Sequence, residues 1–117
     1  MNLYEKLEVY QRSYKMTVSL YKYTETLPKE ERYAMASQIR RAVMSIPLNI
    51  AEGYGKEDSR QEIKRFLKMA KGSCSEVSVL LDLCKDIGYM EEKAYKRYKE
   101  EIEVIAKMLY KLVQSIK

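Results

Sequence analysis

A single apolar seam runs through the last quarter of the chain and constrains its fold more than any other feature. Apolar side chains recur there at alternating intervals of three and four residues, which places them on one face of an α-helix. The seam consists of Tyr95, Tyr98, Ile102, Ile105, Leu109, Leu112 and Ile116. A helix with one apolar face must bury it against other elements, and no segment alternates with the period of a strand. We therefore expect a bundle of helices.

Four segments carry a helical pattern, and short breaks separate them. They cover residues 4–27, 30–54, 59–88 and 91–116. Pro28 ends the first segment, Gly53 and Gly55 close the second, and Gly88 closes the third. Because connections this short force neighbouring helices to be antiparallel, we predict an all-α, up-down-up-down four-helix bundle. One domain, residues 1–117, accounts for the whole chain.

The second segment keeps its helical periodicity through a proline. Apolar residues stay on one stripe from Ile39, before Pro47, to Tyr54, after it. A proline inside a helix removes a backbone hydrogen bond and costs about 3 kcal/mol unless packing compensates. We expect the helix to bend at Pro47 rather than to end there.

The second and third segments carry more apolar side chains than one bundle core can bury. The residues off the core stripe are Met44, Leu48, Gly72, Val79, Leu83 and Ile87. Glycine inside a helix costs about 1 kcal/mol relative to alanine and is usually explained by the close approach of another backbone. We interpret this surface as the contact between subunits of a homo-oligomer.

The charge of the chain permits binding to nucleic acid without requiring it. The chain has 22 basic and 17 acidic residues, a net charge of +5, and basic side chains share one sector in the first half of the third helix. The candidate nucleic-acid-binding residues are Arg41, Lys56, Arg60, Lys64, Arg65, Lys68 and Lys71. Tyr54 is a possible stacking residue. The polar face of the last helix competes as an alternative binding surface, because it carries Lys96, Lys99, Lys107 and Lys111 among Glu100 and Glu103.

The absence of histidine and of catalytic motifs weakens most enzyme hypotheses. The chain has no histidine, and its two cysteines, Cys74 and Cys84, lie about 15 Å apart along one predicted helix. No nucleophile elbow or phosphate-binding loop is present. We expect no catalytic activity, no metal and no cofactor. Without a long apolar run or a signal-peptide pattern, we expect a cytoplasmic protein.

Several short sequences along the chain match one family. They are residues 38–56, Arg65-Phe66-Leu67, Gly72-Ser73 with Glu76, Leu7-Glu8-Val9-Tyr10, Leu27-Pro28-Lys29-Glu30-Glu31 and Lys85-Asp86-Ile87-Gly88-Tyr89. With them the chain resembles the small four-helix-bundle proteins encoded in intervening sequences of bacterial 23S ribosomal RNA genes. These are related to the accessory variability determinants of diversity-generating retroelements. The resemblance implies a barrel-shaped homopentamer of four-helix protomers.

Two functions are compatible with the sequence and the resemblance. The first is a non-enzymatic, oligomeric module that binds RNA or another nucleic acid by docking its phosphate backbone on the basic surface. The second is a protein-interaction scaffold, or an accessory subunit for a reverse transcriptase in a diversity-generating retroelement. A reverse transcriptase gene beside this one would favour the second function.

Overall fold

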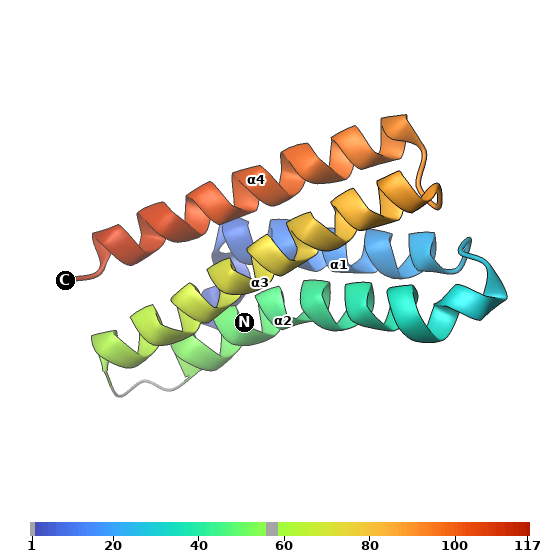
Figure 1. The fold of residues 1–117 in the computed structure, drawn as a ribbon. Coiled ribbons are helices and arrows are strands. Elements are labelled where there is room, and N and C mark those ends of the chain that lie inside the picture. The colour runs from blue at the N-terminus through green and yellow to red at the C-terminus, as the bar shows by residue number, and fades with distance from the viewer. Residues whose placement is uncertain (1, 56–58) are drawn as a thin grey trace.

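The computed structural model describes residues 2–55 and 59–117, and in these residues it contains helices and no strand. Four α-helices lie side by side in alternating directions, with the start of α3 and the C-terminus at the same end of the molecule (Figure 1). They are α1 (Glu8–Thr24), α2 (Ser37–Gly55), α3 (Arg60–Ile87) and α4 (Glu92–Ser115). The predicted all-α four-helix bundle is therefore confirmed.

Short helical turns precede two of the long helices. A 3₁₀ turn at Leu3–Lys6 precedes α1, and a 3₁₀ turn at Lys29–Glu31 followed by a π-helical turn at Arg32–Ala36 leads into α2. The first helix is shorter than predicted, because Leu7 is extended (φ −73°, ψ 130°) and separates the first turn from α1.

Both ends of α3 are capped. Ser59 accepts a hydrogen bond from the backbone N–H of Glu62 at 3.0 Å, which satisfies one of the free donors of the first turn. Gly88 has a φ of 98°, in the left-handed region that favours glycine, and its N–H bonds the last carbonyls of the helix. The break predicted at Gly88 is where α3 ends.

Each long helix contributes one stripe to a common core. The fully buried large side chains include Leu20 of α1, Ile39, Ile46 and Ile50 of α2, Leu67 and Leu81 of α3, and Ile102, Ile105 and Leu109 of α4. Burying one such side chain stabilises the fold by about 1.5–3 kcal/mol. The seam that predicted a helix at the end of the chain is thus the stripe by which α4 joins the bundle.

The helix α2 continues through Pro47, which is itself buried. Proline has no backbone N–H, so residue 47 cannot donate to the carbonyl of Val43, as the helical pattern would require. The hydroxyl of Thr17 on α1 lies 3.2 Å from that carbonyl oxygen and 2.7 Å from the carbonyl oxygen of Ser13. The hydroxyl has one proton, which the two carbonyls share, so a neighbouring helix compensates in part for the hydrogen bond that the proline removes.

A glycine sets the closest approach of α2 to α3. A Cβ on Gly53 would lie 2.9 Å from the Cβ of Phe66, which is too close for two carbon atoms. The side chains of Ser45 and Ser73 are hydrogen-bonded further along the same helix pair. These contacts fix α2 and α3 in antiparallel register.

Candidate nucleic-acid interface

The contacts between α3 and α4 determine which charged residues of the two helices come together. The hydroxyl of Tyr95 donates to Asp82 at 2.6 Å near one end of the pair, and Nη1 of Arg60 donates to the carbonyl oxygen of Lys117 at 3.4 Å near the other. The first half of α3 therefore lies beside the last turns of α4 (Figure 1).

This register joins basic residues of both helices into one surface. We call it the α3/α4 basic surface, and Lys68 and Lys71 from α3 meet Lys107, Tyr110 and Lys111 from α4 there. We include Arg60 and Lys64, which lie two turns and one turn before Lys68 on α3. Two shallow hollows of about 410 and 270 Å³ open on it. Lys71 and Tyr110 line both hollows, and no carboxylate of the described residues lines either of them.

The lysines of this surface keep their positive charge available. Among the residues that the structure describes, no carboxylate lies within ion-pair distance of Lys64, Lys68, Lys71, Lys107 or Lys111. Lysine ammonium groups with no carboxylate partner attract phosphate groups. The start of α3 and the end of α4 therefore form a region of positive potential.

Near the other end of the same helix pair, charged and polar side chains of α3 and α4 are hydrogen-bonded to one another. Asp82 accepts hydrogen bonds from Tyr95 at 2.6 Å and from Nζ of Lys99 at 2.9 Å, and Lys99 also donates to Ser78 at 2.6 Å. The Tyr95 hydroxyl, with Lys99, lowers the pKa of Asp82, and the same hydrogen bond raises the pKa of Tyr95 to about 12. This cluster holds α3 against α4 and leaves little charge to attract a phosphate.

The remaining candidate residues lie apart from the α3/α4 basic surface or outside the described residues. Arg65 pairs with Glu62 at 3.0 Å, and its guanidinium lies 4.5 Å from the ring centroid of Phe66. Arg41 is exposed on α2, one helical turn before Ser45. Because Ser45 is hydrogen-bonded to Ser73 of α3, Arg41 lies level with the middle of α3. Lys56 lies outside the described residues. Tyr54 is half-buried, and this burial raises its pKa.

Sequence reasoning missed Tyr110 and treated Lys107 and Lys111 as a competing surface. The structure brings all three together with the lysines of α3. The available signal was local, since Tyr110 directly follows the seam residue Leu109 and directly precedes Lys111. A tyrosine off the core seam and next to a lysine indicates an exposed aromatic ring in a basic setting.

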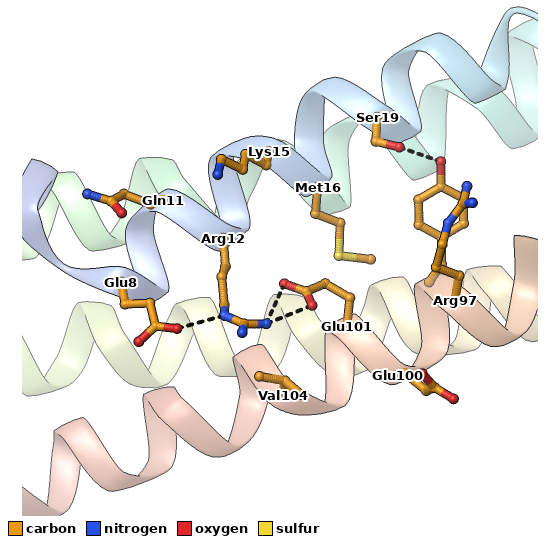
Figure 2. A pocket seen from close by; sticks show the side chains of 11 residues that line it. Glu8, Gln11, Arg12, Lys15, Met16, Ser19, Arg97, Glu100, Glu101 and Val104 are labelled. Carbon is orange, nitrogen blue, oxygen red and sulfur yellow. Dashed lines mark hydrogen bonds and ion pairs between the residues drawn. The ribbon is translucent and has the colours of Figure 1, made fainter.

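A hollow of about 700 Å³ lies between α1 and α4, and its lining differs from that of the basic surface (Figure 2). Its charged lining is balanced, with Arg12, Lys15 and Arg97 facing Glu8, Glu100 and Glu101. Arg12 lies between two carboxylates, at 3.1 Å from Glu8 and 2.9 Å from Glu101 (Figure 2). Because its acids neutralise its bases, this hollow does not suit a phosphate. Within the described part of the chain, no group of three or more acidic or cysteine side chains could hold a metal ion.

Comparison with known proteins assigns the chain to a family. The family model described as 23S rRNA-intervening sequence protein matches residues 5–111. The chain belongs to this family. Its fold is similar to that of a protein of unknown function from the S23 ribosomal protein family of Bacteroides thetaiotaomicron, whose crystal structure has been solved. The two chains are 24% identical over 91% of this chain and 95% of the other, with a TM-score of 0.83. No curated protein matches the chain.

In this member of the family, the residues predicted at a subunit contact are exposed. Met44, Leu48, Val79, Leu83 and Ile87 are between 38% and 58% exposed, and Met69 of α3 joins them at 45%. A Cβ on Gly72 would meet nothing within 4 Å, so nothing in the described protomer explains this glycine. The predicted contact surface is therefore uncovered in a single protomer.

None of the described helices is long and apolar enough to cross a membrane.

Proposed function

We propose that this protein is a non-enzymatic module that binds RNA or another nucleic acid through the α3/α4 basic surface. The observation that carries the proposal is the convergence of four lysines, Lys68 and Lys71 with Lys107 and Lys111, around two adjoining hollows without a described carboxylate in the lining. Phosphate contacts of this kind carry no sequence information, so the protein recognises backbone and shape rather than base edges.

We further propose that the protein acts as a homo-oligomer, with the pentamer of the family resemblance as the expected state. The exposed apolar side chains of α2 and α3 support this, because a stripe of this kind is normally covered in a stable protein. A ring of five protomers would present the basic surface five times. Repetition would then raise the overall affinity well above that of one weak site.

The test is a charge reversal with a matched control. Lys68→Glu/Lys71→Glu changes the basic surface, and Lys93→Glu/Lys96→Glu makes the same change in net charge on two exposed lysines at the other end of α4. Binding of a fluorescent RNA hairpin with an unpaired loop, and of a DNA duplex, is measured over a range of salt concentrations from low to above physiological. Light scattering gives the mass of every sample.

The expected result is a binding constant that falls steeply with salt for the wild-type protein. The first variant loses at least about tenfold in affinity, and its slope against log salt falls by about 1 for each phosphate group that it no longer binds. The control variant keeps the affinity of the wild type, because its lysines lie outside the proposed surface. No binding at low salt by an intact oligomer would refute the proposal, as would equal losses in the two variants.

The second candidate function is a scaffold or accessory subunit that binds another protein, such as a reverse transcriptase of a diversity-generating retroelement. The observation that favours it is additional apolar surface on α1, where Tyr14 is 55% and Val18 is 42% exposed one helical turn apart. If this function is correct, Val18→Glu abolishes co-purification with a reverse transcriptase encoded beside this gene and leaves RNA binding unchanged. Unchanged co-purification would count against the scaffold.

A further inference from the structure

Tyr110 occupies a position on the α3/α4 basic surface that packing does not explain. Its side chain is 54% exposed, although the adjacent seam residue Leu109 is fully buried. Nζ of Lys71, on the other helix, lies 5.5 Å from the centroid of its ring. The ring also lines both hollows, so it stands between them. An exposed aromatic ring at this point is available to a ligand from either hollow.

The surroundings of Tyr110 distinguish it from the other exposed tyrosines of the described chain. Tyr14 and Tyr33 are 55% and 93% exposed, and among the described side chains no cation lies over either ring. Tyr110 has Lys71 over its ring and Lys107 and Lys111 beside it in the lining of the smaller hollow. Proteins that bind single-stranded nucleic acid combine these two elements, because the aromatic ring stacks on a base while the cations hold the backbone.

We propose that the α3/α4 basic surface binds unpaired nucleotides, with one base stacked on Tyr110 and the neighbouring phosphates held by Lys71 and Lys107. This inference rests on the proposed function and names its ligand class. In a duplex the faces of the bases are already stacked on one another, so only an unpaired segment can present a base to the ring. On binding, the ammonium of Lys71 leaves the ring and pairs with a phosphate. The free energy of an exposed cation–π contact is about the same as that of a weak ion pair, so exchanging one for the other changes the free energy of binding little.

The experiment compares single strands with duplexes and removes the ring without removing charge. Labelled RNA and DNA single strands, and the corresponding duplexes, are titrated with the protein at low salt and at one fixed, moderate salt concentration. Tyr110→Leu removes the ring, Tyr110→Phe keeps it, and Tyr14→Leu is the matched control at a tyrosine of nearly equal exposure. A 2-aminopurine base in each single strand reports stacking through the quenching of its fluorescence. Circular dichroism verifies that each variant is folded.

We expect single strands to bind more tightly than duplexes. Tyr110→Leu should then weaken single-strand binding by about 10- to 100-fold and abolish the quenching, as the loss of one stacked base predicts. Tyr110→Phe and Tyr14→Leu should keep nearly the wild-type affinity, and duplex binding should be the same in all variants. The RNA and DNA arms show which sugar the surface accepts.

Two results would overturn the inference, and they differ in what they mean for the proposed function. If single strands and duplexes bind equally, and Tyr110→Leu changes nothing while Lys68→Glu/Lys71→Glu abolishes binding, the surface docks phosphates without stacking a base. The inference then fails and the proposed function stands. If no oligonucleotide binds even at low salt, both fail together.

Discussion

The hydrogen bond from Thr17 to the carbonyl of Val43 leads to a sharp prediction about stability. Thr17→Val removes a hydrogen-bond donor that lies 3.2 Å from that carbonyl oxygen. The other acceptor of the Thr17 hydroxyl, the carbonyl of Ser13, keeps its regular helical donor, the N–H of residue 17. Of the two acceptors, the Val43 carbonyl is the one that lacks its regular helical donor, because residue 47 is a proline.

The magnitude follows from the cost of leaving a partly buried carbonyl without a partner. That cost is about 1–3 kcal/mol, whereas the net gain from a typical hydrogen bond is about 1 kcal/mol. We therefore expect Thr17→Val to lower the free energy of unfolding by about 1–2 kcal/mol. In a Pro47→Ala background the new N–H of residue 47 can donate to the carbonyl of Val43. In that background Thr17→Val should change the free energy of unfolding by close to zero. The coupling energy between the two sites is then about 1–2 kcal/mol.

A double-mutant cycle measures this coupling. The four proteins are unfolded with urea at one fixed protomer concentration, and far-UV circular dichroism gives the free energy of unfolding by linear extrapolation. Thr26→Val is the control. The Thr26 hydroxyl also donates to a nearby backbone carbonyl, that of Tyr23, but among the described residues it has no acceptor on a second helix. Its effect should be independent of Pro47→Ala. If Thr17→Val costs the same in both backgrounds, within about 0.3 kcal/mol, the reasoning is wrong.

Three further predictions concern packing, pH and reactivity. Gly53→Ala should lower the free energy of unfolding by about 1–3 kcal/mol, because its Cβ would lie 2.9 Å from a side chain of α3. Gly72→Ala, with nothing within 4 Å, should raise it by about 0.5–1 kcal/mol, and should lower the assembled mass in light scattering if that face contacts another subunit. Asp82→Asn should destabilise the protein by less than about 1 kcal/mol at neutral pH. The folded-state pKa of Asp82 is lowered, so this stabilisation is present above the unfolded-state pKa and is lost as the pH falls through the folded-state pKa. The free energies of unfolding of Asp82→Asn and of the wild type, measured with urea, should therefore become equal in acid. Burial raises the pKa of Cys74 to about 12 and also raises that of Cys84, so a thiol reagent at mildly alkaline pH should label both cysteines in denaturant and neither in the native protein.

Much of the fold could be predicted because the deciding signals are local. The seam of α4 and the break at Gly88 depend on the helical repeat and on the backbone preference of a single residue. These properties act within one or two turns of the chain. The first helix was predicted too long because an apolar pattern does not reveal where the backbone becomes extended, as it does at Leu7.

The candidate site was predictable only in part, because it is composed of two helices. The lysine stripe of α3 was visible as a sector of one helix, but its junction with Lys107, Tyr110 and Lys111 depends on the antiparallel register of α3 and α4. Arg65 was expected on the same surface, and its pairing with Glu62 required the rotamers of both side chains. Local charge patterns indicate which residues are basic, and the tertiary contacts determine which of them act together.

The sequence by itself determined that the chain forms four antiparallel helices, because helical periodicity and short connections are properties of the covalent chain. Only the tertiary structure decided that Thr17 donates to the Val43 carbonyl, to which Pro47 cannot donate, and that Tyr110 lies beside lysines of two helices. The physical reason is that such contacts join residues far apart in sequence. The interlocking of side chains in the core sets the register of the helices, and that register brings these residues together.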